Sequence, residues 1–435
     1  MKRTKIILAV ILATLLFIAG SACSLWPEDP IEPVTSEPPA PGPVTIRYLT
    51  FRCGNHDAAA AEKIFIDGFG EQYKGKIALN VEYLPSDQVY YEKLKVLAAS
   101  NDLPDVFEGN LGILETAVAS GQAVDMTEYI NADPAYRQSF SDEVLKAGQI
   151  DGKQYAVSYG LQIIGYYYNK EMFQKAGIRP AETWEEFLSN CEALKARGYT
   201  PLSLMTGENC WTTNLLLSAV CGTDGEKGNA FVNTKNPKTY QTEEFIRALD
   251  FMKTLLCEYS PPDVVNLTYA ATADYFFSER TAMIPNGSWM APDFENAEKT
   301  SPGFKEKVGV ALFPEQSAVY QYELGLSIAS SDEKTQQAAF EFIKYKTCEA
   351  GQLIHFQHGG VLPLSIVDEA SVQQFKGDNP VLNLYLQKIP EVKIKYRSIN
   401  MLCKPFTLEK FPALYDQLIS GEISAGQFAS ELDQK

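Results

Sequence analysis

Hydrophobic positions alternate with polar ones in some segments of the chain and follow helical spacing in others. Residues 44–51 and 77–83 alternate as strands do, whereas residues 58–73 and 90–99 carry the spacing of helices. The short segment 105–107 predicts a third strand. Strand and helix in repetition predict a parallel sheet, so the predicted fold class is α/β.

Capping residues and a glycine predict further boundaries. Thr183 and Ser330 each stand three residues before a glutamate, and such capping boxes open helices. The segment 419–432 has helical spacing and predicts a C-terminal packing helix. Two β-rich segments flank Gly160, so we expect the chain to connect two lobes near this residue. A length of 435 residues also exceeds one ordinary core, which favours two lobes.

The N-terminus has the composition of a secretory signal. A basic head at residues 1–5 precedes an uncharged segment at 6–19 and a run of small residues that ends in Cys23. The uncharged segment would rise only about 21 Å as a helix, short of the ~30 Å hydrocarbon core, so a permanent membrane span is disfavoured.

This leader resembles the bacterial lipoprotein signal, although Gly20 stands where that pattern usually has Leu, Val or Ile. The resemblance implies a signal peptide at 1–22, cleavage before Cys23 and lipidation of its sulfur. Plain cleavage with release of the protein is the alternative. Seven prolines lie between residues 24 and 43, so 23–43 is predicted to be the lipid anchor and an extended tether.

Net charge and cysteine and histidine content restrict the partners, cross-links and cofactors that can be expected. The formal net charge of −17 disfavours nucleic acid as a partner. Beyond Cys23, seven scattered cysteines make no disulfide framework, and we expect free thiols, with Cys210 and Cys221 as the one pairing to check. His355 and His358 stand three apart without a third ligand at a supporting spacing, so we expect no metal site and no cofactor.

Common catalytic signatures do not occur in the sequence. It contains no G-x-S-x-G elbow, no Walker loop and no dinucleotide fingerprint. We therefore expect that the protein is not an enzyme. A pair of carboxylates in a glycoside hydrolase leaves no mark in sequence, so a secreted or tethered glycoside hydrolase is the alternative hypothesis.

Several short blocks resemble one protein family. YNKEMF at 168–173, TWEEF at 183–187 and AMIPNGSW at 282–289 occur in an order and spacing similar to those of extracellular solute-binding proteins that feed sugar importers of the ATP-binding-cassette (ABC) type. LPDVFEGN at 103–110 matches more loosely. The resemblance implies a two-lobed, periplasmic-binding-protein-like (type II) fold, with a hinge between lobes that close over a mono- or oligosaccharide.

The same resemblance implies boundaries and partners. Lobe 1 is expected at 44–158 with a return segment at 313–329, and lobe 2 at 159–312 with 330–435. The partners would be the sugar, the transmembrane permease subunits and, through the lipid on Cys23, the membrane. A monomer at the extracytoplasmic face of the cell membrane is expected, and the anchor would suit a Gram-positive cell surface.

The expected ligand contacts follow from the resemblance and from position after strands. Trp289 stands where sugar binders of this family often offer a stacking ring, and a buried core tryptophan is the alternative interpretation. The other candidates are polar, aromatic or glycine residues of loops: Tyr159, Glu208, Asn209, Trp211, Asn55, His56, Asp57, Glu108, Asn110, Asn286 and Gly325, with Arg52 as a weaker one. Amide and carboxylate groups can hold several sugar hydroxyls at once.

Overall fold

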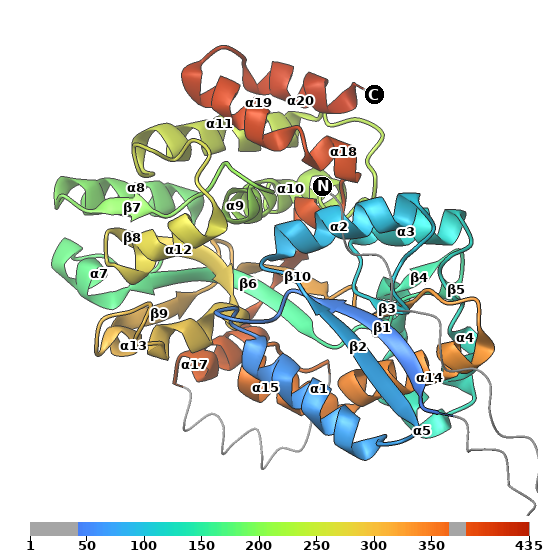
Figure 1. Ribbon diagram of the computed structural model, residues 1–435. Helices are drawn as coiled ribbons and strands as arrows, with labels where there is room; N and C mark the ends of the chain where they lie inside the picture. Colours follow the sequence, from blue (N-terminus) through green and yellow to red (C-terminus); the bar gives the residue numbers. More distant parts are fainter. Residues whose placement is uncertain (1–41, 365–379, 435) are drawn as a thin grey trace, which may run out of the picture. The chain divides into compact units, whose positions relative to one another are not determined.

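A four-stranded sheet begins the folded part of the chain in the computed structural model, which describes residues 42–364 and 380–434 (Figure 1). Its order is β11-β3-β1-β2. The strands are β1 (Val44–Thr50), β2 (Ile77–Tyr83), β3 (Val106–Phe107) and β11 (Ser327–Ile328). β1 pairs in parallel with β2 and β3, whereas β11 runs antiparallel to β3. The predicted parallel α/β arrangement is confirmed for this sheet.

Alternation along β1 directs side chains to two opposite faces of this sheet. Tyr48 lies in one hydrophobic core with Phe342, and Leu49 lies in another with Leu94. The surrounding helices are α1 (Ala59–Gln72), α2 (Asp87–Ala99), α3 (Leu111–Ala119), α4 (Thr127–Asn131), α5 (Pro134–Gln138), α6 (Asp142–Ala147), α14 (Glu333–Thr347) and α15 (Glu349–Gly359). A small hairpin joins β4 (Gln149–Ile150) to β5 (Lys153–Gln154).

A second, six-stranded sheet is built around a long buried strand. Its order is β12-β10-β6-β8-β7, and β9 also pairs with β6. The strands are β6 (Leu161–Asn169), β7 (Thr200–Leu202), β8 (Thr281–Gly287), β9 (Val308–Ala311), β10 (Ser317–Tyr322) and β12 (Ile394–Tyr396). Most side chains of β6 and all of β8 are buried, as expected for strands covered on both faces.

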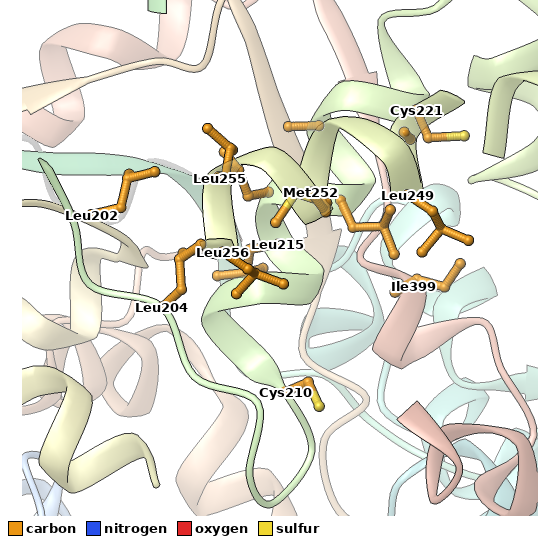
Figure 2. Packing of buried hydrophobic residues seen from close by; sticks show 14 of the residues in the cluster. Leu202, Leu204, Cys210, Leu215, Cys221, Leu249, Met252, Leu255, Leu256 and Ile399 are labelled. Carbon is orange, nitrogen blue, oxygen red and sulfur yellow. The ribbon is translucent and has the colours of Figure 1, made fainter. Parts of the chain in front are cut away.

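Helices pack on this second sheet around a large core. They are α7 (Lys170–Ala176), α8 (Trp184–Ala196), α9 (Trp211–Gly222), α10 (Gly225–Phe231), α11 (Glu243–Glu258), α12 (Tyr269–Phe277), α13 (Phe304–Lys307), α17 (Pro380–Lys388), α18 (Pro405–Leu408), α19 (Phe411–Ser420) and α20 (Ala425–Asp433), with 3₁₀ helices η1 (Ser288–Glu295), η2 (Ile389–Glu391) and η3 (Ile399–Met401). Figure 2 shows Leu215 of α9 beside Leu255 and Leu256 of α11. α9 is therefore a buried central helix.

Three chain segments pass between the two sheets and contact one another. Val157 forms a bridge with Leu326, and Leu161 forms one with Leu362. Between them, the Glu323 amide donates to the Gly160 carbonyl at 2.9 Å. The segment around Gly160, where a connection is predicted, is one of these three within the described residues.

Gly325 lies in one of these connections and meets a steric requirement there. Its φ is +85°, and a Cβ at this position would lie 1.9 Å from the Val157 carbonyl oxygen. Only glycine fits such a backbone position without strain. Gly325 thus brings two connections into close contact, which is a structural explanation for a residue that we expected to contact ligand.

The contacts differ from the predicted lobe boundaries in two places. β10 falls within the predicted return segment 313–329, yet it pairs with β6 of the second sheet. α14 and α15 fall within the stretch 330–435 that we assigned to lobe 2, yet α14 packs on β1 and α15 packs on α1. An amphipathic pattern shows that a helix has a buried face, but it does not show which sheet covers that face.

Two local predictions also need correction. The N-cap of α14 is Asp332, whose carboxylate accepts from the Thr335 amide at 2.8 Å, and not Ser330. The single helix predicted at 419–432 is wrong, because Gly421 ends α19 in the left-handed conformation and α20 begins after Ser424. Thr183 does cap α8 as predicted.

The predictions for residues 1–22 and for Cys23 fall outside the described residues, as does most of the tether. None of the described helices combines the length and hydrophobicity needed to cross a bilayer.

Candidate functional site

Two tryptophans that lie far apart in sequence face each other beside the second sheet. Trp211 is the first residue of α9, and Trp289 follows β8 in η1. Their ring centroids are 6.2 Å apart and the ring planes meet at 51°. Both residues are partly exposed, and Trp289 also packs against two separate hydrophobic cores. The candidate Trp289 is therefore neither a free surface ring nor a fully buried one.

Tyr269 and Asn286 lie next to this aromatic pair. The Asn286 side chain is buried, and its Nδ2 donates to the Tyr269 hydroxyl at 2.9 Å. Its Oδ1 accepts from the Gly287 amide at 2.9 Å, which fixes the turn before Trp289. Burial raises the pKa of Tyr269 and the nearby Asp57 carboxylate raises it further, whereas the hydrogen bond from Asn286 opposes the shift. Tyr269, which no sequence pattern indicated, thus lies beside Asn286 and near Asp57.

The loop after β1 contributes charged groups at the same place. The Nδ1 of His56 and the Oδ1 of Asp57 are 2.7 Å apart. Asp293 of η1 forms an ion pair of 2.6 Å with Lys299, and the same amine donates to the Asn55 carbonyl at 3.2 Å. Burial raises the pKa of Asp293; the Lys299 amine opposes this, and the Asp57 carboxylate adds to it.

Glu208 and Asn209 reach the site from the turn before α9. Glu208 has a φ of 52°, and its Oε2 accepts from the Tyr269 amide at 2.9 Å. Burial raises the pKa of this carboxylate and the Asp87 carboxylate adds to the shift. The Asn209 carbonyl accepts from Asn400 Nδ2 at 2.8 Å. Both candidate side chains are exposed, as ligand-contacting groups need to be.

We call these residues the aromatic site. The structure brings together eight of the predicted residues with five that were missed: Asn55, His56, Asp57, Glu208, Asn209, Trp211, Asn286 and Trp289, then Asp87, Tyr269, Asp293, Lys299 and Asn400. The missed residues lie within, at the start of or just after helices, whereas the predicted candidates lie mainly in loops after strands.

Three other candidates form a separate, internally satisfied network. Arg52 donates to both oxygens of Glu108, at 2.6 and 2.8 Å, and to the Tyr159 hydroxyl at 2.6 Å. That hydroxyl donates to Glu108 at 2.8 Å, and the Tyr159 ring stacks on His355 at 4.3 Å. Tyr159 and Glu108 are buried, so these groups brace the connection between the sheets.

Asn110 also has a local structural partner. Its Oδ1 accepts from the Ile113 amide at 3.1 Å and caps α3. A side chain that caps a helix satisfies one of the unpaired amides of the first turn.

Glu323 adds a titratable group to the connection between the sheets. Burial raises its pKa to about 7, the Glu108 carboxylate contributes, and Arg52 and Gln162 oppose the shift. The folded state then binds a proton more tightly than the unfolded state. The free energy of unfolding should therefore fall as pH rises from about 4.5 to about 7, by up to about 3 kcal/mol.

We expect Glu323→Gln to remove that part of the pH dependence, because an amide cannot ionise. Urea unfolding of both proteins between pH 4.5 and 8 measures the slope. Glu422→Gln, on an exposed residue, is the matched control and should leave the slope unchanged. Equal slopes for the wild type and Glu323→Gln would contradict the assignment.

The cysteines and the possible metal ligands among the described residues form neither a disulfide nor a metal site. All seven described cysteines are free, and Cys210 and Cys221 stand at opposite ends of α9, about 16 Å apart along the helix, too far to pair. The described part of the chain contains no cluster of three or more His, Cys, Asp or Glu that could hold a metal. Cavities of about 450 and 630 Å³ lie away from the aromatic site, one beside Arg137 and the other beside Cys348.

Sequence comparison relates the chain to known binding proteins. Residues 65–374 match the family described as bacterial extracellular solute-binding protein. The multiple sugar-binding protein of Streptococcus mutans is 28% identical over 319 residues, which cover 70% of this chain and 71% of that protein. The mannitol-binding protein of Pseudomonas aeruginosa is 26% identical over 222 residues, 48% of this chain and 49% of that protein.

Solved structures agree at the level of the fold. A chitin oligosaccharide binding protein has a TM-score of 0.74 at 21% identity, over 90% of this chain and 97% of that chain. The GacH receptor of Streptomyces glaucescens, solved unliganded and with acarbose, has a TM-score of 0.70 at 20% identity, over 90% and 97%. These likenesses confirm the predicted two-lobed α/β fold. Because the family match at residues 65–374 spans most of this chain, the chain belongs to the bacterial extracellular solute-binding protein family.

Proposed function

We propose that the chain binds a mono- or oligosaccharide at the aromatic site and delivers it, chemically unchanged, to the permease subunits of an ABC importer. The observation that carries the proposal is the pair of partly exposed rings of Trp211 and Trp289 beside hydrogen-bonding groups. Indole faces suit the C–H faces of pyranose rings, and the relatives described above include proteins named for binding sugars.

Polar groups around the two rings have capacity left for a ligand. Glu208 and Asn209 have exposed side chains. Sugar hydroxyls both donate and accept, so they can satisfy carboxylate, amide and hydroxyl groups at once.

Hinge closure supplies the step between capture and delivery in this proposal. Loops of both lobes contribute to the aromatic site, as the bond from Lys299 to the Asn55 carbonyl illustrates. A ligand that contacts both lobes binds the closed state better than the open one, and this difference is what shifts the population. The permease would then recognise the closed form.

The proposed location is the extracytoplasmic face of the membrane, with a lipid on Cys23 and the protein as a monomer. The support is the leader sequence together with membership of an extracellular family. The mass of the mature N-terminal peptide distinguishes a lipidated Cys23 from a free N-terminus produced by plain cleavage.

A thermal-shift screen against mono- and oligosaccharides tests the binding function, with the non-lipidated chain from Ser24 onward as the sample. A saccharide at a hundred times its dissociation constant should add about 2.7 kcal/mol to the free energy of unfolding. Chromatography afterwards should recover the sugar intact. Cleaved sugar would establish the glycoside hydrolase instead, and the absence of a shift with every saccharide would contradict the proposal.

A further inference from the structure

We propose that the aromatic site accepts uncharged or amine-bearing saccharides and rejects saccharides that carry carboxylate, sulfate or phosphate groups. This inference rests on the proposed function and specifies the chemical class of its ligand. It follows from which charged groups surround the two tryptophans and from how the positive ones are already engaged.

Carboxylates outnumber cations around the site. Asp57 and Asp293 lie on the Tyr269 side. The Lys299 amine bonds both to Asp293 and to the carbonyl of Asn55, two residues before Asp57, and the Asp57 carboxylate adds to the raised pKa of Asp293. Glu208 contacts the Tyr269 amide, and Asp87 lies near enough to raise the pKa of Glu208. Four acidic side chains from both lobes therefore share one region.

The positive groups of this region are occupied by protein acceptors. Lys299 is held by Asp293 at 2.6 Å and by the Asn55 carbonyl at 3.2 Å. Arg52, on the same loop but in the separate network described above, is bound at both ends of its guanidinium by Glu108. An anionic sugar would have to break one of these pairs to gain a counter-charge.

Ligand chemistry then follows from what carboxylates can do. An ionised carboxylate accepts hydrogen bonds and donates none, so it binds hydroxyl and ammonium groups and repels anions. The repulsion is strong beside Asp57 and Asp293, because their side chains are only 14% and 13% exposed and a partly buried site screens charge weakly. A protonated amine on the sugar would instead relieve the repulsion between Asp57 and Asp293.

The test is a binding array of oligosaccharides matched in linkage and length. For each backbone, calorimetry compares a neutral form, a form with free amines and a form with carboxylates or sulfates. We expect the acidic member to bind at least tenfold more weakly than its neutral counterpart, and the aminated member to bind at least as well. A saccharide that binds in its acidic form with equal or higher affinity would overturn the inference and leave the proposed function intact.

Charge-removing variants test the cause. The double variant Asp57→Asn/Glu208→Gln should reduce several-fold the ratio of the affinities for the neutral and the acidic saccharide of each pair. Glu258 of α11 forms an exposed ion pair with Lys195 of α8. Glu258→Gln removes one charge from this pair and should leave the difference in affinity between neutral and acidic saccharides unchanged. An unaltered affinity ratio in the double variant would contradict the electrostatic explanation. If no saccharide of any charge class binds, the proposed function fails, and this inference fails with it.

Discussion

Replacing Trp289 with alanine should weaken saccharide binding about a hundredfold or more. The ring faces Trp211 at 6.2 Å, so its loss removes one wall of the site and leaves Trp211 without its aromatic neighbour. Aromatic residues at the centre of a binding site commonly contribute about 2–4 kcal/mol on truncation, which corresponds to that loss of affinity. Titration calorimetry with the saccharide found in the thermal-shift screen measures the effect.

The same substitution should also lower the stability of the empty protein. The ring packs against both cores of the second sheet, and Gly287 lies directly against it. A loss of about 2 kcal/mol is expected for a half-buried ring. Calorimetry therefore needs conditions in which the variant remains folded.

Trp184→Ala separates the two effects. Trp184 is also half-buried, packs on Phe187 and Phe251, and donates from Nε1 to Thr223 at 2.8 Å. Its removal should cost similar stability and leave the saccharide affinity unchanged. If Trp289→Ala loses no more affinity than Trp184→Ala does, Trp289 is a core residue only.

Local patterns predicted individual strands and helix starts because the causes of these features are local. The alternation at 44–51 and the cap at Thr183 act through residues adjacent in sequence, and both features occur in the structure. The helix predicted at 419–432 failed for the same kind of reason, since its hydrophobic spacing hid the break at Gly421. Spacing reports which residues are buried, whereas a glycine in the left-handed conformation decides where the helix stops.

The candidate site could be predicted only in part, because it is formed by residues that lie far apart in the sequence. Trp289 was identified through a motif and Trp211 through its position after a strand, but nothing in the sequence showed that Tyr269 would contact Glu208 and Asn286. Glu108 and Tyr159 were expected to face ligand because they follow strands. In the structure both side chains are buried and hydrogen-bonded to Arg52 or to each other, so they have no groups left for a ligand. Such pairing depends on the tertiary structure and leaves no pattern in the sequence.

The structure also contains a buried ion pair that no sequence pattern indicated. Lys346 of α14 and Glu62 of α1 are each 1% exposed and lie 2.6 Å apart. Tyr48 of β1 donates to Glu62 at 2.6 Å and accepts from Lys346 at 2.9 Å. Burial would raise the pKa of Glu62, but Lys346 and Arg52 outweigh it, so the carboxylate stays ionised with a lowered pKa. The pair therefore links two helices to the first sheet.

Lys346→Met should lower the free energy of unfolding by about 3–5 kcal/mol, because it leaves the Glu62 carboxylate buried without a counter-charge. Without the lysine, burial should raise the pKa of Glu62 above its unfolded value, so the folded variant gains a proton more easily. Its stability should then be greater at pH 5 than at pH 8. Urea unfolding at the two pH values measures both effects.

Two further variants decide whether the stranded charge is the cause. Adding Glu62→Gln to Lys346→Met removes the charge, keeps an acceptor for Tyr48, and should recover much of the stability along with a flat pH response between 5 and 8. Lys195→Met, in an exposed ion pair with Glu258, should change stability little. If the double variant is no more stable than Lys346→Met alone, the cost comes from lost packing of the lysine side chain among Tyr48, Phe65 and Phe342 and not from an unpaired carboxylate.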